Sequence, residues 1–309
     1  MILKRILNSL RALLGLALIA SNTLAHVLPL FLVALVKMLV PVKAVRRLCS
    51  HLLAGIAESW IAVNSALIAS MTHTRFHVSG ISKLQRRGGY LVLCNHQSWV
   101  DIPVLQKVFN RRIPFMRFFL KSQLIWVPVL GLAWWALDFP FMKRHSRAAL
   151  ERRPELRHQD MQATRRACRR FRGIPVSIMN FVEGTRFRPE KHVRQASPYR
   201  HLLRPKAGGV ALVLESMGEA LRTVLDVTIV YSQGRPSMLH LLMDQIPDIH
   251  VSVREYTVPE ELQFRDSEGE REYRTRVQQW LNTLWAEKDK LIEEVIRSHG
   301  GVNSITSPV

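Results

Sequence analysis

The 309-residue sequence predicts an α/β fold, a sheet flanked by helices, preceded by an N-terminal membrane-embedded helical segment. Two observations lead to this prediction. After residue 72, short apolar runs with strand character alternate with helix-like segments, which is typical of an α/β sandwich rather than of separate all-β and all-α halves. Before residue 72, two long stretches carry almost no charge, which is typical of helices in contact with a bilayer.

The first apolar stretch, residues 12–36, has no charged residue and is long enough to cross a hydrocarbon core of about 30 Å. The second stretch, residues 48–72, has Glu58 as its only charge. For the first stretch the alternative is a cleavable signal peptide, with a basic start at residues 1–5 and a cleavage region at residues 21–25. Because the apolar run continues past Ala25, we expect an anchor.

Basic residues flank the first apolar stretch on both sides, so the positive-inside rule gives no clear orientation. They are Lys4, Arg5 and Arg11 before it and Lys37, Lys43, Arg46 and Arg47 after it. Two arrangements remain open: a helix that dips into one leaflet, bent near Asn22-Thr23 or Pro29, and a single span. We expect the first, with residues 48–72 returning along the interface.

The cysteines bear on the compartment. Cys49, Cys94 and Cys168 form no Cys-x-x-Cys pair, which fits a reducing cytosol. We therefore expect the cytoplasmic (inner) membrane, with the rest of the chain facing the cytosol.

The elements after residue 72 follow in order. Strand-like runs lie at residues 76–79, 90–94, 176–181, 210–214 and 224–231, and helix-like segments at 102–109, 159–171 and 211–221. Where two candidates overlap, we expect the helix 211–221. A long helix over 271–296 carries Trp280, Leu284, Leu291 and Val295 near one stripe and ends at Gly300-Gly301. The predicted organisation is membrane helices at 1–72, a catalytic domain at 73–255, a helical region at 256–301 and a disordered tail at 302–309.

The most informative motif is Asn95-His-Gln-Ser-Trp99, with Asp101 two residues further on. It follows the apolar run 90–94, so His96 and Asp101 lie where a strand leads into a helix. A histidine whose second ring nitrogen is held by a carboxylate has a fixed tautomer and can take a proton from a hydroxyl. A histidine and an aspartate at this spacing also occur by chance, so the pair alone is weak evidence.

A second motif, Phe181-Val-Glu-Gly-Thr-Arg186, follows the apolar run 176–180. Together the two motifs resemble the glycerophospholipid acyltransferases, the family that includes 1-acylglycerol-3-phosphate acyltransferase. Phe139-Pro-Phe-Met-Lys-Arg144 and Arg204-Pro-Lys-Ala-Gly-Gly209 are similar to two further blocks of that family, in the same order. The resemblance covers about residues 74–232 and implies a glycerolipid acyltransferase-like sandwich with a mixed sheet.

Two departures concern the acceptor. The family's fourth block is rich in proline, whereas residues 224–231 contain none. The tail 280–292 is similar to the tryptophan-containing helix of the lysocardiolipin and lysophospholipid acyltransferase branch. The acceptor therefore remains open between 1-acyl-glycerol-3-phosphate, which we expect, and a lysophosphatidylglycerol-like or lysocardiolipin-like lipid.

The resemblance implies a direct attack without an acyl-enzyme. His96 would be the base and Asp101 its orienting partner, and the acceptor hydroxyl would attack an acyl thioester of acyl carrier protein or coenzyme A. The implied contacts to the phosphate of the acceptor come from Arg144, Glu183, Gly184, Thr185 and Arg186, with a further anion contact from Lys206, Gly208 and Gly209. We expect no cofactor and no metal, since the 12 histidines show no metal-binding spacing.

Each site residue has a structural alternative. Glu183 and Arg186 could form an ordinary loop ion pair, and Arg144 and Arg147 could belong to a solvated basic face. Cys94 ends an apolar strand, and we expect it to fill the core rather than to act as a nucleophile.

The formal net charge is +20, and basic residues are densest over residues 143–172. Such a surface attracts anionic lipid headgroups, and it suits an acidic carrier protein or the phosphates of coenzyme A. The rival hypothesis is a non-enzymatic, membrane-tethered regulator that binds nucleic acid. Because the arginine-rich segment lacks interleaved aromatic residues and no zinc-ligand pattern accompanies it, we do not expect nucleic acid as a partner.

Overall fold

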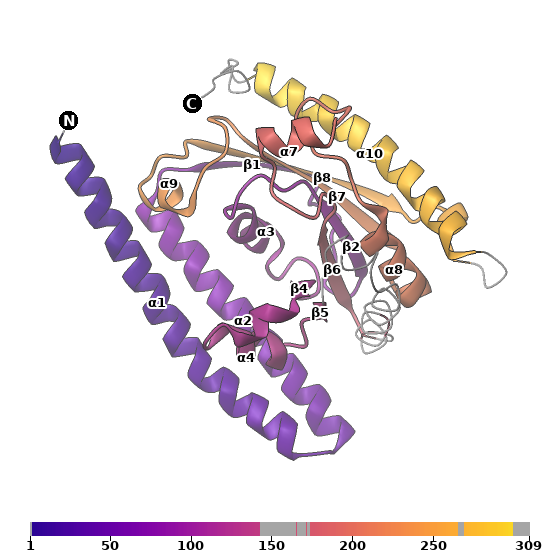
Figure 1. Cartoon of the computed structure of the whole chain (residues 1–309). Coiled ribbons are helices and arrows are strands. Elements are labelled where there is room, and N and C mark those ends of the chain that lie inside the picture. Colours follow the sequence, from indigo (N-terminus) through magenta and orange to yellow (C-terminus); the bar gives the residue numbers. More distant parts are fainter. Residues whose placement is uncertain (1, 143–164, 166–170, 172–173, 265–268, 299–309) are drawn as a thin grey trace.

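A helical hairpin and an α/β sandwich make up the computed structural model, which describes residues 2–142, 165, 171, 174–264 and 269–298. The hairpin consists of α1 (Ile2–Leu39) and α2 (Lys43–Met71), which lie side by side along one flank of the molecule (Figure 1). Both helices are long and apolar enough to cross a membrane by length and composition.

Polar side chains join the two helices of the hairpin. The Asn22 amide donates to Asn64 Oδ1 at 2.8 Å, and the Trp60 indole donates to the Thr23 hydroxyl at 3.0 Å. Where a bend near Asn22-Thr23 or Pro29 was expected, α1 continues as one helix through all three residues. Asn22 and Thr23 serve interhelical hydrogen bonds, which are favourable where water is scarce.

The sandwich is built on a mixed six-stranded sheet in the order β1-β8-β7-β2-β6-β3. Its strands are β1 (Arg75–Ser79), β2 (Gly89–Cys94), β3 (Met116–Phe118), β6 (Val176–Phe181), β7 (Thr223–Tyr231) and β8 (Asp248–Thr257). All neighbouring pairs are parallel except β7 and β8. After β2 the chain continues to β3 and β6, which lie on one side of β2. From β6 it then crosses to β7 on the other side. In sheets of this kind ligands bind at the carboxyl end of the strand where the connections diverge, which here is β2.

Helices cover both faces of the sheet (Figure 1). Leu91 and Leu93 of β2 face a core shared with α8 (Ala207–Met217) and α10 (Glu270–Ser298). Val92 and Cys94 face a second core, shared with α3 (Asp101–Phe109) and with Ile68 of α2. Because β2 is buried on both faces, it reads as a continuous apolar run rather than as an alternating one.

The remaining elements are short. They are β4 (Leu120–Lys121), the 3₁₀-helix η1 (Ser122–Trp126), α4 (Leu130–Ala136), β5 (Phe141–Met142), α7 (Pro189–Arg194), η2 (Gly218–Ala220), α9 (Met238–Leu242) and η3 (Glu260–Leu262). Strands β4 and β5 pair with each other in a separate ribbon.

The structure confirms the mixed sheet flanked by helices and corrects several details. Residues 210–214 are helical, as expected, but α8 begins four residues earlier than the predicted 211–221 and ends at Met217. Strand β8 was missed, although it alternates apolar and polar residues. The predicted helix 159–171 and the glycines at 300–301 lie outside the described residues, apart from Arg165 and Phe171.

The buried face of α10 also differs from the predicted stripe. It is formed by Tyr273, Val277, Leu281, Leu284, Trp285, Lys288 and Ile292. Of the predicted stripe only Leu284 is fully buried, whereas Trp280 and Val295 pack at the edge of the core. A buried lysine replaces an apolar residue at the centre of this face, and a pattern of apolar residues does not reveal it.

Candidate active site

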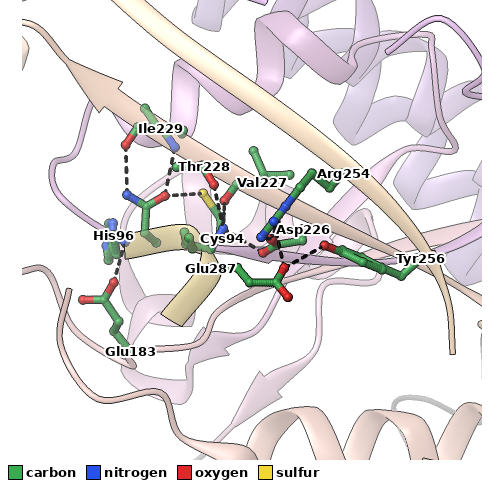
Figure 2. Close-up of polar contacts among 12 residues, drawn as sticks. Cys94, His96, Glu183, Asp226, Val227, Thr228, Ile229, Arg254, Tyr256 and Glu287 are labelled. Atoms are coloured by element: carbon green, nitrogen blue, oxygen red, sulfur yellow. Dashed lines mark hydrogen bonds and ion pairs between the residues drawn. The ribbon is translucent and has the colours of Figure 1, made fainter. Parts of the chain in front are cut away.

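His96 lies two residues beyond the end of β2, at the carboxyl edge of the sheet. The residue before it, Asn95, is fully buried and pairs with Ile229 of β7 by accepting from its N–H and donating to its carbonyl, both at 2.9 Å (Figure 2). Asn95 thereby extends the β2–β7 ladder by one residue through its side chain. This fixes the point from which the His96 side chain departs.

Asp101 opens α3 and is the centre of the hydrogen-bond network around His96. Its Oδ2 accepts from His96 Nδ1 at 2.8 Å and from the backbone N–H groups of Gln97 and Ser98 at 2.7 and 2.9 Å. Its Oδ1 accepts from the Tyr231 hydroxyl at 2.6 Å. The carboxylate is fully buried, so these donors replace the water that it loses.

This network sets the tautomer of His96. An ionised carboxylate can only accept, so Nδ1 carries the proton and Nε2 holds the lone pair. The ring stacks on Phe181 of β6, with 3.8 Å between centroids, and the His96 side chain keeps 13% of its surface exposed. The ring is thus fixed on one side, and its Nε2 lone pair is available, which is the geometry that a general base requires.

Glu183 lies beneath the same loop and is fully buried. Its two carboxyl oxygens accept from the backbone N–H groups of His96 and Leu203, each at 3.3 Å. Figure 2 shows the contact with His96. Burial raises the pKa of Glu183 to about 8, against the lowering effect of these two N–H groups. In this position Glu183 holds the His96 loop against the segment before α8, rather than facing a substrate.

The loop after Glu183 carries the other predicted residues. Gly184 has φ +69°, a conformation that favours glycine, and its N–H donates to the Phe181 carbonyl at 2.8 Å. Thr185 accepts a hydrogen bond from the Lys191 ammonium. The Arg186 guanidinium lies over the exposed Trp99 ring, 4.6 Å from its centroid, and this contact holds it beside the His96 loop.

Positive charge gathers around this loop. Burial lowers the pKa of Lys191, and nearby cationic side chains lower it further: those of Arg188, Arg186, Arg194 and Lys206. Mutual repulsion of this kind is relieved when an anion binds. We call Arg186, Lys191 and Lys206 the cationic loop cluster.

Lys206 precedes α8, and its backbone N–H donates to the Val182 carbonyl at 2.9 Å. Its ammonium lies over Gly184, where an added Cβ would be 3.4 Å from Nζ. Gly208 and Gly209 open α8 and pack instead against Arg274 and Asn180, which an added Cβ would approach to 3.1 and 2.9 Å. Packing therefore accounts for glycine at both positions. The anion contact expected of Gly208 and Gly209 is not needed to explain them and stays a prediction.

The structure thus brings together His96, Asp101, Glu183, Gly184, Thr185, Arg186 and Lys206, whereas Arg144 lies outside the described residues. Sequence analysis assigned no role to Tyr231, Phe181, Trp99 or Lys191. Trp99 and Phe181 lie inside the two motifs, which could have drawn attention to them. Tyr231 ends an apolar strand, and only the fold reveals its contact with Asp101.

A buried ion network supports the floor of the site from α10. The Lys288 ammonium is fully buried, lies 2.7 Å from Asp226 Oδ1 and donates to the Val227 carbonyl at 2.5 Å. Asp226 also pairs with Arg254 of β8 at 2.7 Å (Figure 2). These contacts reach β7 just before Ile229, so the C-terminal helix helps to set the strand that holds Asn95.

Cys94 is fully buried, and burial raises the pKa of its thiol, which agrees with a role in the core. Within the described part of the chain, no cluster of three or more His, Cys, Asp or Glu side chains is arranged to hold a metal ion.

The fold is also that of a solved enzyme. The structure of the 1-acyl-sn-glycerophosphate (LPA) acyltransferase PlsC from Thermotoga maritima superposes with a TM-score of 0.56 and 16% sequence identity, over 94% of this chain and 97% of that one. At this identity the likeness concerns the fold, and it includes the N-terminal hairpin because nearly the whole of both chains is covered.

Residues 75–232 match the family model described as Acyltransferase, and the chain belongs to that family. Among its curated relatives is the mouse 1-acyl-sn-glycerol-3-phosphate acyltransferase epsilon, 24% identical over 66% of this chain and 57% of the relative. The human gamma enzyme is 24% identical over 56% of this chain and 44% of its own length, and the mouse delta enzyme 25% identical over 58% and 45%. The chain thus spans about half the length of these relatives.

Proposed function

We propose that this protein is a membrane-bound O-acyltransferase that moves a fatty acyl group from a thioester to the free hydroxyl of 1-acyl-glycerol-3-phosphate. The observation that carries the proposal is the His96–Asp101 pair, whose carboxylate is held by three further donors and which lies beside the cationic loop cluster. The family and the curated relatives support the reaction class.

The reaction requires one proton transfer to and one from His96. Nε2 takes the proton of the acceptor hydroxyl as its oxygen attacks the thioester carbonyl carbon. The carbon–sulfur bond then breaks, and the proton on Nε2 passes to the departing thiolate. Asp101 stabilises the imidazolium between these steps and keeps its own charge, as the carboxylate of a Ser-His-Asp triad does.

The cationic loop cluster would hold the phosphate of the acceptor. Arg186 offers a planar fork of donors, and Lys191 and Lys206 add two point charges. Glu183 acts here through the His96 loop, as a positioning residue, and Arg144 remains a proposed phosphate contact from its motif.

We also propose that the hairpin lies in the plane of one leaflet. The catalytic domain contacts α1 near both of its ends, through Arg11 with Asp244 at 2.8 Å and Lys37 with Asp138 at 2.6 Å. These points lie roughly 40 Å apart along the helix at about 1.5 Å per residue. A hairpin held lengthwise against the domain cannot stand across a bilayer while the domain stays outside, so the in-plane arrangement is favoured over a span.

The donor and the compartment follow from the chemistry. Acyl carrier protein and coenzyme A thioesters are water-soluble and anionic, which suits the basic surface, and the cytoplasmic (inner) membrane is the proposed location. Protease added outside intact cells or spheroplasts should leave the catalytic domain uncut. Cleavage from outside would contradict the orientation.

The test of the reaction is turnover by the full chain purified in detergent, with a panel of lysophospholipids and both donors. His96→Ala should lower turnover by about 10²- to 10⁴-fold, and Asp101→Asn nearly as much. The matched control is His77→Ala, because His77 Nε2 makes a comparable contact of 2.8 Å to Asp248 on the far edge of the sheet. Full turnover in His96→Ala would refute the mechanism.

A further inference from the structure

Outside the hairpin, exposed large apolar side chains of the described residues concentrate in one place. The segment from the end of η1 through α4 carries five of them, which we call the tryptophan ridge: Trp126, Val129, Leu130, Leu132 and Trp135. Trp126 is 85% exposed, Leu132 56% and Trp135 49%. Residues 122–137 contain no charged side chain, whereas the other exposed apolar residues of the sandwich are scattered singly. A contiguous exposed apolar patch marks an interaction surface.

The backbone of the ridge is held in a fixed and strained shape. Val129 has φ +65°, which is rare for a β-branched residue, and Leu130 N–H donates to the Pro128 carbonyl at 2.7 Å. Gly131 allows the chain to pass close to itself, since an added Cβ would lie 2.0 Å from the Ile125 carbonyl oxygen. The tight turn and the close approach define the backbone path of the segment that carries the ridge side chains.

The ridge is attached directly to the hairpin. The inner face of α4, with Ala133 and Ala136, packs in one core with Leu30 of α1 and Leu53 of α2. Lys37, which ends the apolar run of α1, donates to the Ala136 carbonyl at 3.3 Å and to Asp138. Its charge is therefore neutralised where the two apolar surfaces meet, as burial at a bilayer surface requires.

We propose that the tryptophan ridge is a second lipid-contact surface, which inserts into the interfacial region of the same leaflet as the hairpin. This rests on the membrane attachment proposed above. The continuity with the apolar outer face of α1, the neutralised cation and the choice of tryptophan all fit lipid rather than protein, since tryptophan concentrates where hydrocarbon meets headgroups.

The ridge has a task that the hairpin cannot perform. A narrow two-helix hairpin lying in a leaflet resists rotation of the attached domain about its long axis only weakly, and a second contact point stops this rotation. A row of aromatic rings then leads from the end of α4 towards His96: Phe139 to Phe118 at 6.4 Å, Phe118 to Phe181 at 6.3 Å, and Phe181 to the His96 ring at 3.8 Å. With this rotation stopped, the domain keeps the row of aromatic rings, and the face of His96 that stacks on it, turned towards the lipid.

Fluorescence quenching tests lipid contact without using activity. The full chain is bound to phosphatidylcholine vesicles with or without bromine on the acyl chains, and the difference between wild type and Trp126→Phe isolates the emission of Trp126. We expect brominated lipid to quench this difference by about half or more, with Trp280→Phe on α10, which packs against the core on the α8 side of the sheet, as the control that leaves the quenching unchanged. Quenching of the rest of the protein but not of Trp126 would overturn the ridge alone. No quenching in any variant would overturn the membrane attachment and the ridge with it.

Activity provides the second readout. The double variant Trp126→Ser/Leu132→Ser should turn over lysophospholipid embedded in vesicles about tenfold more slowly, yet stay within about twofold of wild type in detergent micelles, where no plane constrains the domain. The matched control is Val193→Ser, which changes a 77% exposed apolar side chain of α7. Equal vesicle rates in wild type and double variant would overturn the proposal. This is also the result expected if a soluble protein, rather than lipid, covers the ridge.

Discussion

The hydroxyl of Tyr231 donates a hydrogen bond to Asp101 Oδ1 at 2.6 Å. Burial, followed by the nearby Asp101 charge, raises the pKa of Tyr231 well above its usual value, so it remains a neutral donor. Tyr231→Phe should therefore cost about 1.5–3 kcal/mol of stability, the range for a hydrogen bond to a charged group, and should slow turnover about tenfold. Thermal unfolding and kcat measure the two effects.

The control for this change is Tyr256→Phe. Tyr256 donates to Glu287 at 3.4 Å on the exposed side of β8, so its loss should change neither quantity. If Tyr231→Phe behaved like Tyr256→Phe, the Asp101 carboxylate would not depend on its fourth donor.

Glu183 predicts a dependence of stability on pH. Burial raises its pKa to about 8 in the folded state, above the unfolded value near 4.5. Below about pH 4.5 the group is protonated in both states. Between about 4.5 and 8 only the unfolded state loses the proton, so the stability contributed by Glu183 falls as pH rises.

Glu183→Gln removes this titration while it keeps an acceptor for the His96 N–H. Wild type should lose thermal stability relative to Glu183→Gln as the pH is raised from 5 to 8, and the difference should level off above that. Parallel melting curves across the range would show that Glu183 is ionised throughout.

Arg186 tests the phosphate site. Arg186→Ala should raise the apparent KM for the lysophospholipid by about tenfold and leave the KM for the donor nearly unchanged, because it removes a charge-assisted contact to phosphate. Steady-state kinetics with each substrate varied in turn separates the two. An effect on the donor alone would move Arg186 to the carrier site.

At the scale of single residues, the sequence motifs show which residues of the candidate site come together, but not what each side chain contacts. The spacing of His96 and Asp101 predicts a pair at a strand end, and the two side chains do meet. The motif around Glu183 points to phosphate, whereas burial turns its carboxylate to backbone N–H groups. A motif records residue type and order, and only the surrounding packing decides whether a side chain faces solvent.

Among the elements, α10 depends on a buried charge. Lys288 has one buried carboxylate partner, whereas Asp226 has two cations, Lys288 and Arg254. Asp226→Asn leaves a buried ammonium without a counter-ion and should cost about 3–5 kcal/mol, and Lys288→Met should cost less. The double variant should recover part of the loss, because it removes both charges.

Thermal unfolding of the two single variants and the double variant checks this order. Additive losses in the double variant would mean that the two side chains are not coupled. A double variant that regains stability but not turnover would show that α10 also positions β7 beneath Asn95.

Elements with strong periodicity were predictable, and short or unusual ones were not. Strands β1, β2, β6 and β7 follow from their apolar runs, and proline-free β7 forms one continuous buried strand. The ribbon of β4 and β5 is too short to leave a pattern. In α1 the polar residues Asn22 and Thr23 suggested a bend, but they form hydrogen bonds with side chains of α2. Sequence alone does not show which helix provides these hydrogen-bond partners.

For the whole molecule, removal of residues 1–72 should change the nature of membrane binding. The full chain should resist an alkaline or high-salt wash, because its attachment is apolar. The truncated chain should float with anionic vesicles only at low salt, since a Debye length of about 3 Å in molar salt screens the remaining basic residues, which the sequence concentrates over 143–172.

The truncation also exposes apolar surface that the hairpin covers, including the neighbours of Ile68 in the core, so the wash of the full chain is the primary measurement. A full chain released by salt would contradict apolar attachment, and a folded truncated chain that resists salt would place the anchor elsewhere. The sequence alone predicts the anchor at this scale, but the way in which the hairpin lies along the domain depends on pairs such as Arg11 with Asp244, which are 233 residues apart.

The position of β2 in the sheet has a consequence for the order of events during synthesis and folding. Its ladders are with β6 and β7, which follow it in the chain by more than 80 and more than 130 residues, and Tyr231 ends the second of these. Contacts so distant in sequence form late during synthesis from the N-terminus. The helices α1 and α2 leave the ribosome long before the hydrogen-bond network around Asp101 can form. The nascent chain is therefore expected to reach its membrane in an inert form and to gain its chemistry only after delivery.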